Sequence, residues 1–257
     1  MLLKDALKNY SDYELATQYC PSNEKLETTL CFFNFYGQVF PDANLDLDLH
    51  IFFFDKKGMQ TGYVVEKIPG RGFIQIDVRK YVTQDSGMVC LMAIPGRSVT
   101  ALAQQKNIRI RKKLGTGYYV VWKNASGSMD TMHEWMPVNA VRGHDPDHYL
   151  VIDFHERIKS HGIILMNSCF PGKAEEDVRS HPVVEVYSNR LLLESFQIDS
   201  IGPMNTVEVN LEESVAKLEG WLKKYKSLLV KVRGDFLSPP LTKETHVSGD
   251  FHIHHIE

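Results

Sequence analysis

The feature that most constrains the fold is a match between the two halves of the chain. Displacing the sequence by 133 positions aligns residues 28–78 with residues 161–211 without a gap. Apolar residues keep their phase along this alignment, whereas the residues between the apolar segments differ. The matched pairs are Leu30 with Ile163, Phe32 with Leu165, Asn34 with Asn167, Ile51 with Val184, Phe53 with Val186, Phe54 with Tyr187, Ile74 with Val207, Ile76 with Val209 and Val78 with Leu211. Because a one-residue slip would turn every side chain of a strand to its other face, we expect two diverged copies of one folding unit.

The repeated unit has the residue pattern of β-strands. Along residues 45–53, one face of the expected strand carries Leu45, Leu47, Leu49, Ile51 and Phe53. Several such short segments, separated by turn residues, predict an all-β chain made of two tandem antiparallel β-sandwich domains. Proline and glycine gather between residues 137 and 147. We therefore assign domain 1 to residues 1–140 and domain 2 to residues 141–257.

Two segments have helical rather than strand periodicity. Residues 2–10 place their apolar side chains on one helical face, which predicts a short N-terminal helix. The second copy carries an insert at residues 212–226, in which Val215, Leu218 and Leu222 are at helical spacing. We expect one short helix there.

The block LDLHIFFFDKKGMQTGYVVEKIPGRGFIQIDV, at residues 47–78, has a distinctive order of apolar strands and turns. It resembles the small β-sandwich of the sensory rhodopsin transducer family. The resemblance implies a protein that binds partners rather than catalyses a reaction. The second copy departs from the pattern, because residues 188–190 (Ser-Asn-Arg) replace the Asp-Lys-Lys-Gly turn of residues 55–58.

Composition and motifs exclude several classes of function. The formal net charge of -3 gives no bulk electrostatic reason to expect a nucleic acid or an anionic membrane as partner. No apolar run reaches the roughly 18 residues of a membrane span, so we expect no membrane insertion. The four cysteines have no regular spacing, which favours a reduced, cytoplasmic protein. The sequence has no GxSxG elbow, P-loop or GxGxxG, which favours a non-catalytic protein without settling the question.

The C-terminal histidines are the only candidate site that we assign to named residues. On a strand, His252 and His254 would share one face, and His246 lies just across an expected turn. Three imidazoles are a ligand set that zinc, iron or copper accepts, and they would leave one position open. The alternative is an exposed closing strand whose polar face happens to carry histidine.

Other clusters have simpler explanations. Histidines and aspartates near the junction, His144, His148, His155, His161, Asp145, Asp147 and Asp153, suit a solvated linker and strand face. Aligning the two Ser-Gly turns places His133 on His255, and we expect both to make a structural hydrogen bond on an apolar strand face. The basic stretch Lys106, Arg109, Arg111, Lys112 and Lys113 suits an edge strand protected by charge.

Strong core signals and weak catalytic signals favour a non-catalytic binding or assembly protein. The competing hypothesis is a metal-binding protein or metal-dependent enzyme that uses the C-terminal histidines. Residues 51–54 and 118–122 carry large apolar groups on both faces, so we also expect a homo-oligomer unless the neighbouring copy covers them.

Overall fold

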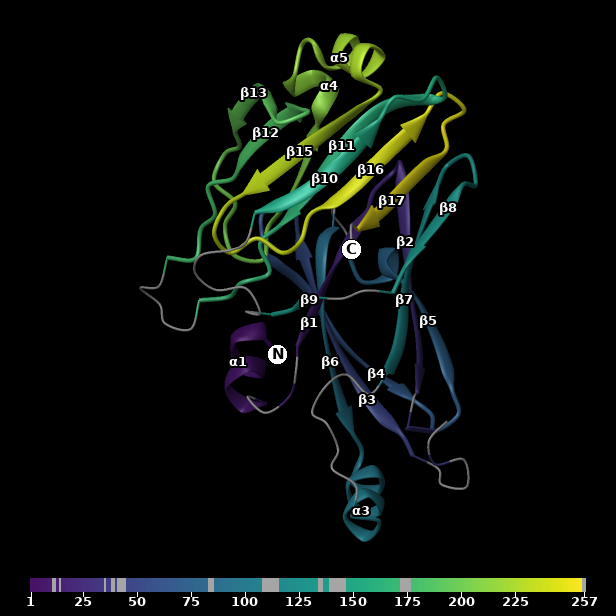
Figure 1. Cartoon of the computed structure of the whole chain (residues 1–257). Coiled ribbons are helices and arrows are strands. Elements are labelled where there is room, and N and C mark those ends of the chain that lie inside the picture. The colour runs from purple at the N-terminus through teal and green to yellow at the C-terminus, as the bar shows by residue number, and fades with distance from the viewer. Residues whose placement is uncertain are drawn as a thin grey trace. The chain divides into compact units, whose positions relative to one another are not determined.

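The structure is a computed structural model that describes the chain except residues 11, 12, 14, 35, 38, 39, 41–44, 83–85, 108–115, 134, 135, 139–146, 172–176, 256 and 257. The chain divides into two compact units. The first comprises Met1–Lys123 with Thr131–Val138, and the second comprises Asn124–Asp130 with Asn139–Glu257. The prediction of an all-β chain is confirmed (Figure 1).

The first unit contains a five-stranded sheet and a four-stranded sheet, in the orders β4-β3-β6-β1-β9 and β5-β2-β7-β8. Its strands are β1 (Ala16–Ser22), β2 (Leu26–Asn34), β3 (Leu47–Asp55), β4 (Gln60–Ile68), β5 (Phe73–Asp77), β6 (Ser86–Pro95), β7 (Thr116–Asn124), β8 (Met129–Met132) and β9 (Met136–Pro137). Phe53 of β3 stacks on Tyr81, which follows β5, with ring centroids 5.7 Å apart. Gln18 of β1 donates from Nε2 to the sulfur of Met132 in β8 at 3.3 Å. The core therefore lies between the two sheets.

The second unit contains two four-stranded sheets, in the orders β10-β15-β12-β13 and β14-β11-β16-β17. Its strands are β10 (His148–Asp153), β11 (Ile158–Met166), β12 (Val183–Ser188), β13 (Leu191–Gln197), β14 (Thr206–Asn210), β15 (Ser227–Arg233), β16 (Leu241–His246) and β17 (Phe251–His255). Buried residues of both sheets form one core, among them Leu150, Val186 and Val230 from one sheet and Ile163 and Leu165 from the other.

The two units have the same strand order. Taken in chain order, β1 to β8 occupy the positions that β10 to β17 occupy in the second unit. The register of β3 with β4 shifts between Phe53 and Phe54, and the register of β12 with β13 shifts between Val186 and Tyr187, 133 positions later.

A buried asparagine makes the same hydrogen bonds in each unit. Nδ2 of Asn34 donates to the carbonyls of Leu45 and Ile68, at 2.6 and 3.3 Å. The equivalent bonds in the second unit run from Nδ2 of Asn167 to Val178 and Ile201, at 2.7 and 3.1 Å. Donor and both acceptors are displaced by the same 133 positions. The side-chain oxygens of these asparagines accept from the backbone N–H groups of Tyr36 and Cys169.

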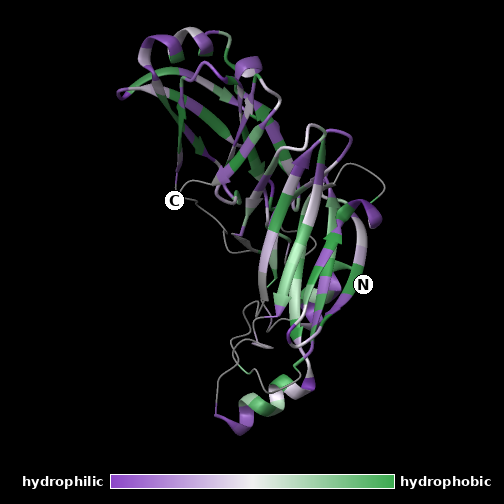
Figure 2. Cartoon of the chain, turned by 90° about the vertical axis from the view of Figure 1, so that its right-hand side faces the viewer, coloured by the Kyte–Doolittle hydropathy of each residue, from purple (hydrophilic) through white to green (hydrophobic). Residues whose placement is uncertain are grey.

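Short helices complete the units. The N-terminal helix is α1 (Leu3–Asn9), and the insert of the second copy forms α4 (Leu211–Ser214) and α5 (Leu218–Tyr225), which lie together at one end of that unit in Figure 1. Leu218 and Leu222 are buried in the core, which contributes roughly 1.5–3 kcal/mol for each side chain. Two further helices, the 3₁₀ helix η1 (Val78–Lys80) and α3 (Arg97–Gln105), are not predicted from the sequence. Figure 2 shows that hydrophobic residues concentrate on the strands and that α3 mixes both kinds.

The apolar groups behind the homo-oligomer prediction are mostly buried within the chain. Residues 51–54 are at most 2% exposed, and Val120 and Trp122 are fully buried, whereas Tyr119 is 45% exposed. These segments therefore leave little apolar surface for a second copy, and the homo-oligomer stays a prediction. None of the helices in the described ranges combines the length and the hydrophobicity that a membrane span needs.

Candidate binding surfaces

The C-terminal histidines lie on the hairpin of β16 and β17. Phe251 and Ile253 are buried, and His252 and His254 are exposed on the opposite face of β17. The rings of His246 and His252 are in contact, with centroids 5.3 Å apart. Nε2 of His246 is buried and has no hydrogen-bond partner among the described residues. Two of the three predicted ligands are thus neighbours.

His254, the remaining predicted ligand, lies further from the β16–β17 turn than His252. His254 pairs with Thr242, whereas His252 pairs with Glu244. Nδ1 of His252 lies 3.9 Å from a carboxylate oxygen of Asp130. Within the described part of the chain, no group of three or more His, Cys, Asp or Glu side chains is arranged to hold a metal ion. The three-histidine metal site stays a prediction.

The other predicted histidines are dispersed. His155 is exposed at a turn, whereas His161 is buried. His133 is exposed beside Tyr119, at 6.1 Å between ring centroids, and Met129 on the same strand face is 62% exposed. The apolar face expected around His133 is therefore exposed rather than part of a core. His144, Asp145, residues 108–113 and the side chain of His255 lie outside what the structure describes.

His161 is the centre of a buried, hydrogen-bonded polar cluster in the second unit. Its backbone N–H donates to Oε2 of Glu212 at 2.8 Å, and its Nδ1 lies 2.8 Å from Oε1 of the same carboxylate. Its Nε2 lies 3.1 Å from the carbonyl oxygen of Asp153. Asn210 caps the helix that carries Glu212 by accepting from the Glu212 N–H at 3.0 Å. The cluster therefore connects β11 to α4 and to the end of β10.

Opposing effects act on this histidine. Burial lowers the pKa of His161, but the hydrogen bond and the charge of Glu212, with the Asp153 carbonyl, outweigh it, and the pKa is raised from its usual value. Both ring nitrogens are occupied. The imidazole therefore holds the fold together and has no free nitrogen with which to act as a general base.

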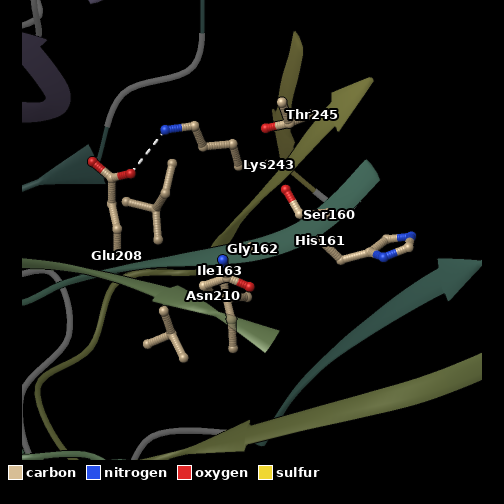
Figure 3. A pocket seen from close by; sticks show the side chains of 10 residues that line it. Ser160, His161, Gly162, Ile163, Glu208, Asn210, Lys243 and Thr245 are labelled. Carbon is tan, nitrogen blue, oxygen red and sulfur yellow. Dashed lines mark hydrogen bonds and ion pairs between the residues drawn. The ribbon is translucent and has the colours of Figure 1, made fainter. Parts of the chain in front are cut away.

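Two hollows lie on either side of β11. A pocket of about 400 Å³ opens beside the His161–Glu212 pair and is lined by side chains of both charges, including Lys159, Glu219 and Lys223. A smaller hollow of about 170 Å³ lies over Gly162, and Figure 3 shows the imidazole of His161 pointing away from it. The Glu208–Lys243 ion pair, at 2.8 Å, borders this hollow. Neither hollow is predicted from the sequence.

The outer face of the β10-β15-β12-β13 sheet carries exposed apolar side chains. Four residues are consecutive register partners across all four strands: Val151, Leu229, Tyr187 and Leu192. We call these four residues the apolar row. The exposed fractions of Val151, Leu229 and Leu192 are 51%, 37% and 47%. Their strand neighbours, such as Leu150 and Val230, are buried in the core, so the apolar row points away from it.

An ion-pair network runs beside the apolar row. Nζ of Lys231 lies 2.7 Å from a carboxylate oxygen of Asp147, and Arg233 lies 2.8 Å from Oε1 of Glu185. The hydroxyl of Tyr187 donates to Oε2 of Glu185 at 2.9 Å. The hydrogen bond from Lys231 lowers the pKa of Asp147. This network fixes the side chains that border the apolar row.

The comparisons with known proteins identify no family. No family model and no curated protein matches the sequence. An α-L-rhamnosidase of Streptomyces avermitilis, solved with L-rhamnose, is 9% identical with a TM-score of 0.25, over 94% of this chain and 25% of that chain. The M60 catalytic domain of Clostridium perfringens ZmpB with its CBM51-1 and CBM51-2 domains is 8% identical with a TM-score of 0.22, over 86% of this chain and 31% of that chain. The chain thus spans a third or less of these proteins, and both TM-scores are too low to indicate a shared fold.

Proposed function

We propose that this chain is a non-catalytic binding or assembly protein, and that the outer face of the β10-β15-β12-β13 sheet is its interaction surface. The observation that carries the proposal is the apolar row. Single exposed apolar residues are ordinary, but four in direct register form a continuous strip. Such a strip, bordered by an ordered polar network, is the usual anatomy of a protein interface.

The polar chemistry of the described residues supports the same function. The buried histidine–carboxylate pair, His161 and Glu212, is committed to hydrogen bonds that join secondary structure elements. All four cysteines are buried, and burial strongly raises the pKa of the Cys90 thiol, which disfavours a nucleophilic thiolate.

We further propose that the two units descend from one duplicated domain. The shared strand order, the register shift at the same relative position and the equivalent asparagine hydrogen bonds support this origin. The proposed interaction surface then belongs to one copy of a scaffold that occurs twice.

A metal-binding protein is the second candidate function. It is favoured by the contact between His246 and His252 and by the unpartnered buried Nε2 of His246. A metal ion would supply the partner that this nitrogen lacks.

Photo-cross-linking in cells tests the interaction surface. A benzophenone amino acid replaces Tyr149, which is 49% exposed and flanks the apolar row, or in a control replaces Val247, which is 67% exposed at the far hairpin. We expect a discrete cross-linked product at position 149 only. Equal products at both positions, or none at position 149, would refute the proposed surface.

A further inference from the structure

We propose that the apolar row binds a short amphipathic helix of a partner protein. This inference rests on the proposed function and names the partner's structural class. It comes from a comparison of the two units, because the equivalent face of the first unit already has a helix bound to it.

In the first unit, α1 lies on the outer face of the β4-β3-β6-β1-β9 sheet. Oε1 of Gln60 in β4 accepts from the backbone N–H of Leu3 at 2.8 Å, and Nε2 of Gln60 donates to the carbonyl of Met1 at 3.0 Å. At the other end of the helix, the ring of Tyr10 lies 5.8 Å from His50 of β3. Leu3 and Ala6 are buried at 1% and 0% exposure. They are separated by three positions, so they share one helical face.

The strand pairings identify the residues of the first unit that correspond to the apolar row. Tyr187 of the apolar row pairs with Leu229 and Leu192. The residue 133 positions before Tyr187 is Phe54. Phe54 pairs with Met88 and Gln60, which therefore correspond to Leu229 and Leu192. Phe54 and Met88 are 2% and 0% exposed. The same place in the fold is therefore covered in the first unit, where Gln60 binds α1, and open in the second.

The helices α4 and α5 of the second unit pack against its core and not on the apolar row. Leu211 of α4 and Leu218 and Leu222 of α5 belong to the core cluster on the inner side of the sheets. No helix within the described ranges of this unit packs on the apolar row. We therefore propose an occupant that belongs to another molecule.

The size of the apolar row favours a helix over a second copy of the whole sheet. With strands about 4.8 Å apart, the four residues span about 14 Å. The seven residues of α1 span about 10 Å, which is comparable. A standard protein interface buries about 800 Å² on each partner, far more than four partly exposed side chains provide.

The chemistry of the face defines the helix that it fits. The helix needs apolar residues three or four positions apart, and a small one among them allows close approach, as Ala6 does in α1. Lys231 and Arg233 are already paired with Asp147 and Glu185, so the face has no net charge from this network. A helix with mixed charges on its polar side therefore fits better than a strongly acidic or basic one.

Methyl NMR of the full-length chain tests the proposal, because Val151, Leu192 and Leu229 all carry methyl groups. The probe is a synthetic peptide with the sequence of residues 1–10, MLLKDALKNY. We expect saturable shifts of these three methyl signals, with a dissociation constant on the order of 0.1–1 mM. The control peptide carries serine at the positions of Leu3 and Ala6. In the chain, Val151→Asp should weaken binding at least about tenfold, and Val247→Asp should leave it unchanged.

Three results would overturn the helix proposal: no methyl shifts at millimolar peptide, equal shifts with the serine peptide, or a dimer in light scattering that Val151→Asp dissociates. Val151 and Val247 are both exposed, so their aspartate variants should fold. Melting temperatures equal to that of the unsubstituted chain confirm this. A cross-link at position 149 without peptide binding would contradict the proposal of a helical partner but would still support the proposed interaction surface. Failure of both experiments rejects both proposals.

Discussion

Replacing Asn167 by alanine should strongly destabilise the second unit, and replacing Asn34 should do the same to the first. Asn167 is fully buried and makes three hydrogen bonds, to the carbonyls of Val178 and Ile201 and from the N–H of Cys169. Alanine would remove the side-chain partner of all three backbone groups. Each asparagine joins strand-end segments that are distant in the sequence, so local rearrangement would not restore the bonds.

The magnitude follows from the number of bonds. A typical internal hydrogen bond contributes about 1 kcal/mol net, and a buried group left without its partner costs about 1–3 kcal/mol. We therefore expect Asn167→Ala to lower the free energy of unfolding by about 3 kcal/mol. Asn34 is 2% exposed and makes the equivalent bonds, so the loss for Asn34→Ala should agree to within about 1 kcal/mol.

Native-state hydrogen exchange read by mass spectrometry assigns each loss to a unit, and urea unfolding gives its size. Protection should fall in peptides of the second unit for Asn167→Ala and of the first unit for Asn34→Ala. Gln197→Ala, at an exposed position of β13, should change stability by less than about 0.5 kcal/mol. A loss below about 1 kcal/mol for either asparagine would refute the reasoning, since it would mean that the freed backbone groups find other partners.

Three further predictions concern the histidines and the assembly state. Because the pKa of His161 is raised in the folded chain, its pairing with Glu212 stabilises most below the unfolded value of about 6.5 and less as pH rises through the folded pKa. Glu212→Gln should therefore cost more at pH 5.5 than at pH 8.5, by urea unfolding, with Glu213→Gln as the exposed control. If the C-terminal strand binds metal, protein purified without a metal-affinity step should carry stoichiometric metal that His252→Ala with His254→Ala abolishes, and the affinity should fall as the pH is lowered, because protons compete with the metal for the imidazoles. No bound metal and an unchanged melting temperature with added zinc would reject that site. Light scattering at tens of micromolar decides the homo-oligomer prediction, and a monomer would contradict it.

Alternation and phase predicted strands such as the one at residues 45–53, because each strand of a sandwich has one face in the core and its period is visible locally. Ile51 and Phe53 show this, since both are fully buried. The match of Asn34 with Asn167 also held information: a polar residue repeated within a buried apolar phase indicates a shared hydrogen-bonding role. Its acceptors were not predictable, since Leu45 and Ile68 approach Asn34 only in the folded unit.

Surface features were harder to predict, because burial at a sheet's outer face depends on what packs there. His133 directly follows β8 and Phe54 lies in β3, and both have apolar neighbours, yet His133 is exposed whereas Phe54 is only 2% exposed. Helix α3 was missed, although Val99 and Ala103, its buried residues, are four positions apart. Helix α3 has only nine residues, so its apolar residues repeat over little more than two helical turns, which is too short for a clear periodicity.

The residues next to the apolar row on the same sheet face indicate whether the helix that covers the face is bound permanently or reversibly. In the first unit this position on β3 is Phe52, which is fully buried, and in the second unit it is Glu185, bound by Arg233 and Tyr187. Helix α1 ends at Asn9, only a few residues before β1 begins at Ala16, so a covalent link holds it near its sheet and both rows can be apolar. A face whose partner dissociates must remain compatible with water when it is empty. Charges in one row and apolar side chains in the next satisfy that requirement, which is why we infer reversible rather than constitutive binding at the second unit.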